Sequence, residues 1–108
     1  MMTPSLAIAL DVSDEDEERS STEPVLGQNV PNPFSRETCI RFTIPQSERV
    51  TITILTSGGH LVDTLLDEYL PAGVHSVWWD AKNFASDYYF YRLRTPKATI
   101  LKTMLHLK

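Results

Sequence analysis

Histidine and serine are the residue types in this chain that could catalyse a reaction or bind a metal, but their spacing favours neither role. The three histidines are His60, His75 and His106, and no two have the short separation that brings two imidazoles onto one ion. Ser57 and Ser86 lack the Gly-x-Ser-x-Gly context of a nucleophilic serine. We therefore expect a protein that is not an enzyme, with no catalytic residue, no metal site and no cofactor.

A run of acidic residues near the start of the chain is a second candidate, because carboxylates bind calcium. Residues 11–18 hold six acids in eight positions. A calcium loop of the EF-hand type needs Gly at its sixth position, where this chain has Asp16, and the run contains no Gly. Like charges at this density repel one another, so we expect an extended, solvated linker.

The aromatic residues favour binding over catalysis. Trp78 and Trp79 are adjacent, so they must point to opposite faces of a strand. Trp79 is expected inside and Trp78 outside, in an outward strip with Tyr88 and Phe90. Such a strip could stack on sugar rings, contact a protein partner, or be covered by a neighbouring segment of the chain.

The elements that would position these residues are strands. Polar and apolar residues alternate through 38–44 and 50–54, and further strands are expected at 61–66, 74–80, 88–94 and 98–107, with a short seventh strand within 25–30. Residues 57–60 and 70–73 are expected to form turns. No segment has a helical period. The pattern predicts an all-β fold, a small antiparallel immunoglobulin-like or fibronectin III-like β-sandwich of six to seven strands.

Alternation also predicts which side chains share a face. Tyr89, Tyr91 and Leu93 are expected on one face of their strand, and Leu101, Leu105 and Leu107 on the face that closes the sandwich. The single cysteine, Cys39, excludes an intramolecular disulfide and is expected to be a small apolar filler.

Charge divides the chain into two parts. Residues 1–24 carry seven acids against one base, a net charge of −6, whereas residues 25–108 carry nine bases against seven acids, a net of +2. We expect residues 1–26 to be an acidic flexible linker and residues 27–108 to be the folded domain. No cluster of Lys and Arg lines any segment, so nucleic acid is not expected as a partner.

A Pro-Asn-Pro stretch marks the start of the domain. Pro31 and Pro33 fix their own φ angles and disfavour the α region for the residue before each, so we expect an extended, polyproline-like segment. Asn29 and Asn32 could bond neighbouring backbone groups, and Phe34 supplies an apolar anchor.

The residues at 28–35, 38–44, 73–75, 79–80, 86 and 89–93 together resemble the C-terminal sorting domain of type IX secretion substrates from Bacteroidetes-type bacteria. The pattern is also similar to the immunoglobulin-like domain of the flagellar hook-capping protein. It spans residues 26–108. Three positions depart from the family: Asp87 stands where the family has Gly, Tyr88 stands where it has Val, and His106 stands where it tends to be apolar.

The resemblance implies a non-catalytic, immunoglobulin-like domain that carries an upstream cargo protein through the outer membrane to the cell surface or the medium. The expected partners are the type IX machinery, including a shuttle protein and a sortase-like protease that cleaves in the acidic linker. The residues assigned to the structural motif are Asn29, Pro31, Asn32, Pro33, Phe34, Gly73, Trp79, Asp80, Tyr89, Tyr91 and Leu93. Those assigned to a recognition surface near the last strand are Trp78, Lys102, Met104, Leu105, Leu107 and Lys108.

The sequence shows neither a transmembrane span nor a complete signal peptide, so we expect the chain to be a C-terminal fragment of a larger exported protein. Two other functions remain open. One is a carbohydrate-binding module that uses the outward aromatic strip. The other is a structural spacer or assembly domain that pairs with its own copies through strand edges.

Overall fold

The structure, a computed structural model, describes residues 23–108, so most of the predicted acidic linker lies outside the described residues. Among the described residues there are seven strands and no helix, hence none that could cross a membrane. The strands are β1 (Val25–Leu26), β2 (Glu37–Ile44), β3 (Glu48–Thr56), β4 (Leu61–Leu70), β5 (Gly73–Asp80), β6 (Asp87–Arg94) and β7 (Thr99–His106).

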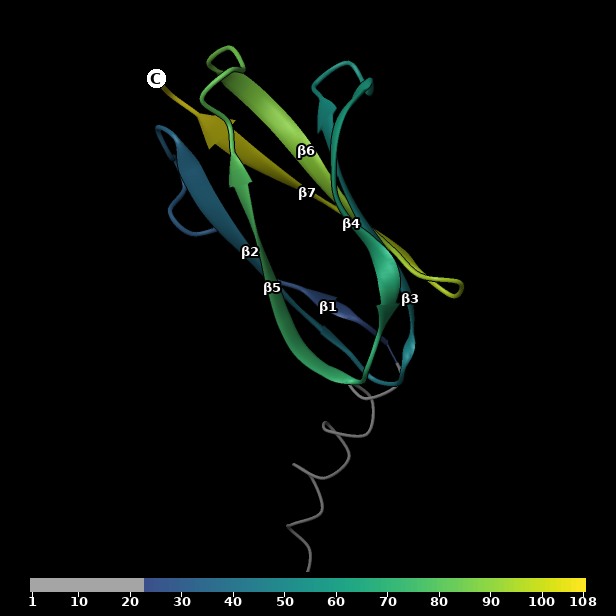
Figure 1. The fold of residues 1–108 in the computed structure, drawn as a ribbon. Coiled ribbons are helices and arrows are strands. Elements are labelled where there is room, and N and C mark those ends of the chain that lie inside the picture. The colour runs from purple at the N-terminus through teal and green to yellow at the C-terminus, as the bar shows by residue number, and fades with distance from the viewer. Residues whose placement is uncertain (1–22) are drawn as a thin grey trace, which may run out of the picture.

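The strands form two antiparallel sheets that pack face to face, as Figure 1 shows. One sheet has the order β1-β2-β5 and the other the order β4-β3-β6-β7. In an immunoglobulin constant-type domain the fourth strand belongs to the first sheet, whereas here it pairs with β3 in the second. The predicted all-β sandwich is therefore confirmed, in its fibronectin III-like form.

The core forms because each central strand presents one apolar face. The inward residues of β2 and β3 are mainly β-branched or aromatic, which suits a pleated surface packed on one side. Trp79 is buried while Trp78 is exposed, as alternation predicts, and the predicted inward face of β6 is also buried. The core cluster comprises Leu26, Phe34, Ile40, Phe42, Ile44, Val50, Ile52, Ile54, Trp79, Ala81, Tyr89, Tyr91, Leu93 and Met104.

The two predicted turns are present. Gly59, in the turn between β3 and β4, has φ 91°, and Gly73, at the start of β5, has φ 131°. Both angles lie in the region that favours glycine. No non-glycine residue in the described part of the chain has a positive φ, so Asp87, at the family's glycine position, adopts an ordinary extended conformation.

The predicted face of the last strand is wrong. Leu101 and Leu107 are each 50% exposed, and Met104 and His106 face the core instead. The turn at residues 95–98 fixes this phase, because it places Leu93 opposite Ile100 and Tyr89 opposite Met104. Directly opposed residues share a face, so a buried residue on β6 requires an inward residue on β7.

Candidate functional site

The three histidines occupy separate structural positions. His60 is exposed in the β3–β4 turn. The ring of His75 stacks on Phe42, with 5.5 Å between centroids, and its Nε2–H donates to the carbonyl of Pro71 at 2.8 Å. Within residues 23–108 no three His, Cys, Asp or Glu side chains come together as a metal site.

Residues 27–34, which we call the crossing segment, run from the first sheet to the second. The peptide bonds before Pro31 and Pro33 are both cis, and residues 31–33 bend. The expected polyproline-like extension is therefore wrong for the prolines themselves. The segment nevertheless fills one side of the sandwich, between β2 and β7.

Backbone hydrogen bonds attach the crossing segment to both sheets. Val30 exchanges two with Cys39 of β2, at 2.9 and 2.8 Å. Phe34 donates to the carbonyl of Leu105 in β7 at 3.1 Å and accepts from the N–H of Leu107 at 2.9 Å. The side chain of Asn32 adds a further link, since its Oδ1 accepts from the Leu105 N–H at 3.0 Å. These contacts cover part of the outer edge of β7.

Asn29 is buried in the crossing segment and its side chain is fully bonded. Its Nδ2 donates to the carbonyl of Pro31 at 3.1 Å and to Oγ1 of Thr38 at 3.0 Å. Its Oδ1 accepts from Nε2 of Gln28 at 2.7 Å, and the Thr38 hydroxyl donates to the Pro31 carbonyl at 2.9 Å. A buried amide with all its partners present specifies one conformation of the segment.

Tyr91 connects the crossing segment to the centre of β6. Its hydroxyl donates to the carbonyl of Gly27 at 2.7 Å and accepts from the backbone N–H of Asn29 at 3.0 Å. Burial raises the pKa of Tyr91, and the hydrogen bond from Asn29 opposes part of that rise. The side chain is therefore a neutral structural group at physiological pH.

An aromatic cluster lies where the crossing segment meets β7. The rings of Phe34 and His106 stack with centroids 5.0 Å apart, and Trp79 meets the edges of Phe34 at 5.9 Å and Tyr89 at 5.2 Å. Phe84 packs on Trp79 at 5.3 Å. Burial, with a smaller contribution from the Asp87 carboxylate, raises the pKa of Tyr89.

His106 is fully buried, and both ring nitrogens face carbonyl oxygens. Nδ1 lies 3.1 Å from the oxygen of Ala85 and Nε2 lies 3.0 Å from that of Ser35. A carbonyl only accepts and a neutral imidazole has one N–H, so the tautomer decides which of these two carbonyls receives the hydrogen bond. The polar residue at this position is accommodated in the core, because His106 stacks on Phe34 and its ring nitrogens face carbonyls of two neighbouring loops.

The remaining motif residues also serve the fold. Leu93 is fully buried. The carboxylate of Asp80 accepts from the backbone N–H of Lys82 at 3.1 Å and lies 3.5 Å from the Arg36 guanidinium. These contacts, with the Lys82 N–H first, lower the pKa of Asp80.

The expected outward strip of three aromatics does not form. Trp78 projects from the outer face of the three-stranded sheet and is 63% exposed. Tyr88 and Phe90 project from the outer face of the four-stranded sheet. The two groups therefore lie on opposite sides of the sandwich and cannot bind one sugar chain together.

The residues expected to form a recognition surface at the last strand do not lie on one surface. Met104 is buried, and Lys102 is half-buried on the core-facing side of β7, opposite Tyr91. Leu107 and Lys108 are exposed, and Leu105 is half-buried on the outer face. Only these last three remain available near the end of β7, while Trp78 lies on the other sheet.

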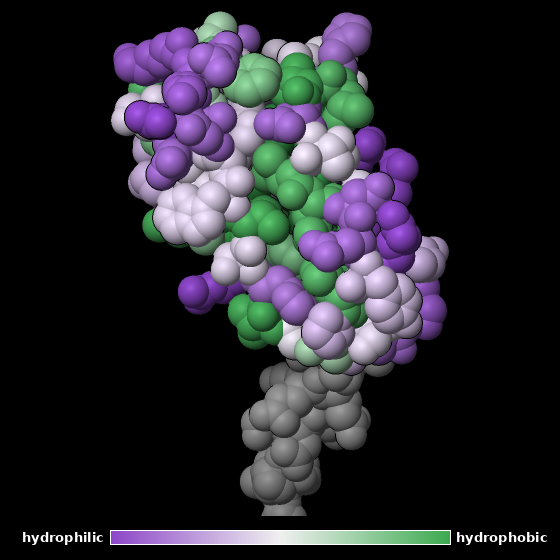
Figure 2. Space-filling model, viewed as in Figure 1, coloured by the Kyte–Doolittle hydropathy of each residue, from purple (hydrophilic) through white to green (hydrophobic). Residues whose placement is uncertain are grey.

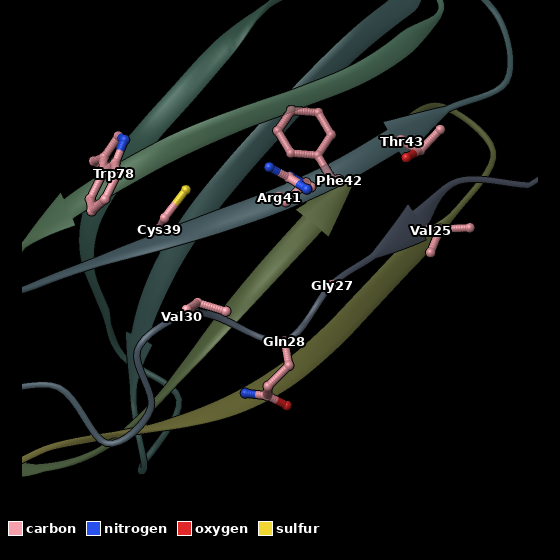
Figure 3. Close-up of a pocket in the computed structure, with 9 residues that line it drawn as sticks. All are labelled: Val25, Gly27, Gln28, Val30, Cys39, Arg41, Phe42, Thr43 and Trp78. Carbon is pink, nitrogen blue, oxygen red and sulfur yellow. The ribbon is translucent and has the colours of Figure 1, made fainter.

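A groove of about 610 Å³ on the outer face of the three-stranded sheet was not expected from the sequence, and Figure 3 shows its lining. Between Gly27 and Val30 the edge strand has one residue more than β2, which is a bulge. The only sequence signal was Gly27 itself, which removes a side chain from the groove floor. The lining residues are Val25, Gly27, Gln28, Val30, Cys39, Arg41, Phe42, Thr43 and Trp78.

The opposite side of the sandwich is bordered by β4 and β5, each the last strand of its sheet. One hydrogen bond spans this side, from Nε1 of Trp79 to Oδ2 of Asp63 at 3.0 Å. Figure 2 shows hydrophobic side chains in a band down this face. The partly buried apolar residues of the two strands are Val62, Leu65, Leu66, Leu70 and Val77.

Comparison with known proteins adds no relative. No family model matches the chain, and no curated protein or solved structure matches it at a significant level. The class that the fold defines is a fibronectin III-like β-sandwich.

Proposed function

We propose that this domain is a non-catalytic secretion signal of the type IX sorting kind, which directs an upstream cargo protein to the outer-membrane surface or the medium. The observation that carries the proposal is that several motif residues of the resemblance contact one another. Asn29 contacts Tyr91, and Phe34 contacts Trp79 across the same side of the sandwich. A shared motif whose members bond one another is expected of a family defined by its fold rather than by a reaction.

A signal that is recognised in the folded state needs exposed groups on a rigid element. Leu107 and Lys108 fit this need, because they follow β7 directly and both are exposed. The backbone of Leu107 bonds Phe34 at 2.9 Å, and the Lys108 N–H donates to Oγ of Ser86 at 2.8 Å. The proposed cleavage site for the sortase-like protease, in residues 11–23, lies almost wholly outside the described residues.

The test is export of a reporter. Residues 1–108 are fused after a signal peptide and a fluorescent protein and produced in a bacterium with an active type IX system. We expect fluorescence at the cell surface or in the medium. Lys108→Glu should reduce export while leaving the melting temperature unchanged, because a single surface charge alters encounter with a receptor more than stability.

Lys97→Glu is the matched control, since Lys97 is exposed in the turn at the opposite end of β7. Export of this variant should equal that of the unaltered fusion. If the unaltered fusion stays in the periplasm while the host exports its own substrates, the sorting proposal is wrong.

A second candidate function is assembly with copies of itself, and the side between β4 and β5 favours it. Both strands are sheet edges, β4 spans ten residues, and apolar side chains lie between them. Such an edge can pair with another strand. The test is the molar mass measured by light scattering from about 10 µM to 1 mM protein, roughly the range over which weak edge pairing appears. A mass that stays that of the monomer throughout would reject self-assembly.

A further inference from the structure

We infer that the groove on the three-stranded sheet binds an extended peptide from another protein, with the pattern aliphatic–x–acidic–x–aliphatic. This inference concerns a different surface from the end of β7 and does not rest on the export proposal. It follows from the order of side chains along the groove, from the charge at its centre and from the free strand edge beside it.

The two ends of the groove are apolar. At one end Val30, Cys39 and Trp78 form a row across the sheet, since Cys39 pairs with both of the others. At the other end Val25 pairs with Thr43. Val25 is 50% exposed and Val30 is 68% exposed, so both present free apolar surface to a ligand. Figure 3 shows the two groups on either side of a middle position.

That middle position is occupied by Arg41. Of the described residues that line the groove, it alone is charged, and its side chain is exposed. The ion pairs seen within residues 23–108 join Arg36 to Asp80 and Arg49 to Asp67, so Arg41 is not a member of either. A guanidinium favours a carboxylate, which it can hold with two parallel hydrogen bonds.

The spacing of these positions matches an extended peptide. Cys39, Arg41 and Thr43 project from the same face of β2 at alternate positions, about 6.6 Å apart. A peptide in the extended conformation has the same repeat. Its side chains at alternate positions therefore meet the Trp78 end, the Arg41 guanidinium and the Val25 end in turn.

The strand edge favours a peptide over an enclosed small molecule. β1 has only two residues, and among residues 23–108 it is the last strand of its sheet, with no further strand paired beside it. An incoming strand can form backbone hydrogen bonds at such an edge while its side chains enter the groove. Gly27 lets the edge strand approach β2 closely, since a Cβ there would lie 3.0 Å from the Arg41 carbonyl oxygen.

The probe is a capped heptapeptide with isoleucine, aspartate and isoleucine at its second, fourth and sixth positions and threonine elsewhere. It is titrated into the isotopically labelled full chain, with binding followed by NMR and calorimetry. We expect saturable shifts at the groove residues. A peptide with lysine in place of aspartate should bind at least about tenfold more weakly, because it places a cation beside Arg41.

Charge exchange gives the decisive control. Arg41→Glu should lose the aspartate peptide and bind the lysine peptide instead. Trp78→Thr should weaken binding roughly tenfold or more, as expected for an aromatic anchor. Arg94→Glu and Tyr69→Thr alter exposed residues of the four-stranded sheet and should leave the affinity unchanged.

Several outcomes would overturn the inference. They are the absence of binding at millimolar peptide, equal binding of both peptides, or shifts confined to β6 and β7. Groove shifts that depend on protein concentration without peptide would assign the groove to a second copy. In a further variant, the acids at 11–18 are replaced by their amides. If this change alone shifts the groove resonances relative to the unaltered chain, and the peptide does not bind, the groove is occupied by the chain's own acidic segment.

Discussion

The imidazole of His106 stacks on the ring of Phe34, with 5.0 Å between centroids and 22° between planes. The contact joins the end of the crossing segment to the last strand, and a parallel bridge between the two backbones runs beside it. The side of the sandwich formed by β2 and β7 is therefore closed by paired side chains and paired backbone together.

His106→Phe separates the packing of this ring from its hydrogen bonds. The substitution keeps an aromatic ring but removes the ring nitrogens that face the carbonyls of Ala85 and Ser35, and with them the N–H that donates to one of these carbonyls. Leaving buried acceptors unpaired costs about 1–3 kcal/mol, and we expect the free energy of unfolding in urea to fall by that amount. Leu107→Ser, at the exposed neighbour, should change it by less than about 0.5 kcal/mol. An unchanged value for His106→Phe would mean that water satisfies both carbonyls.

Asn29 and Asn32 flank the first proline of the crossing segment but should respond differently to truncation. Asn29→Ala removes a buried amide that serves three partners, so we expect a loss of about 2–3 kcal/mol in unfolding free energy. Asn32 is exposed and accepts one hydrogen bond, from Leu105, so Asn32→Ala should cost about 1 kcal/mol or less. Chemical denaturation measures both. Equal losses would contradict the structural role assigned to Asn29.

Tyr91 should make the domain sensitive to alkaline pH. Burial raises its folded-state pKa above the ordinary value of 10.0. The stability that this neutral hydroxyl contributes is therefore complete below about pH 10 and is lost as the pH rises through the folded pKa. We expect the unfolding free energy to fall steeply above pH 10.

Tyr91→Phe tests this origin. At pH 7 it should lower stability by about 1–3 kcal/mol, because the Gly27 carbonyl and the Asn29 N–H lose their partner. Above pH 10 its stability should fall less steeply than that of the parent. Tyr88→Phe, which alters an exposed tyrosine, is the control and should leave the slope unchanged. Parallel slopes for Tyr91→Phe and the parent would assign the alkaline loss to other groups.

Alternation in the sequence was enough to predict the strands and most of their faces. It placed Trp79 inside and Trp78 outside, and it placed the inward residues of β6 correctly. It failed for β7, where the leucines at odd positions are more apolar than Lys102 and His106 at even ones. The register set by the turn after β6 overrides that preference, and His106 is accommodated because nearby carbonyls bond it.

The surfaces were harder to predict, because they depend on strand order. Trp78, Tyr88 and Phe90 all point outward, but alternation does not say from which sheet. Two sheets separate them here. The groove needed more still: the bulge beside Gly27 arises from pairing with β2, and the sequence carries only the glycine as a sign of it.

The end of β7 should stabilise the domain through its backbone and His106 rather than through its leucines. Deleting residues 105–108 removes both backbone bonds to Phe34, the bond to Asn32 and the buried imidazole. Each hydrogen bond contributes about 1 kcal/mol, and the packing of the imidazole is lost as well. The total loss therefore approaches the whole unfolding free energy expected of a small domain, about 5 kcal/mol. We therefore expect circular dichroism to show an unfolded truncated chain at about 25 °C, the temperature to which these free energies refer. The double variant Leu105→Ser with Leu107→Ser keeps the backbone and His106 and should remain folded with a modest loss. A folded truncated chain would show that neither the backbone nor the side chains of residues 105–108 are needed for folding. An unfolded double variant would show that Leu105 and Leu107 close the sandwich after all.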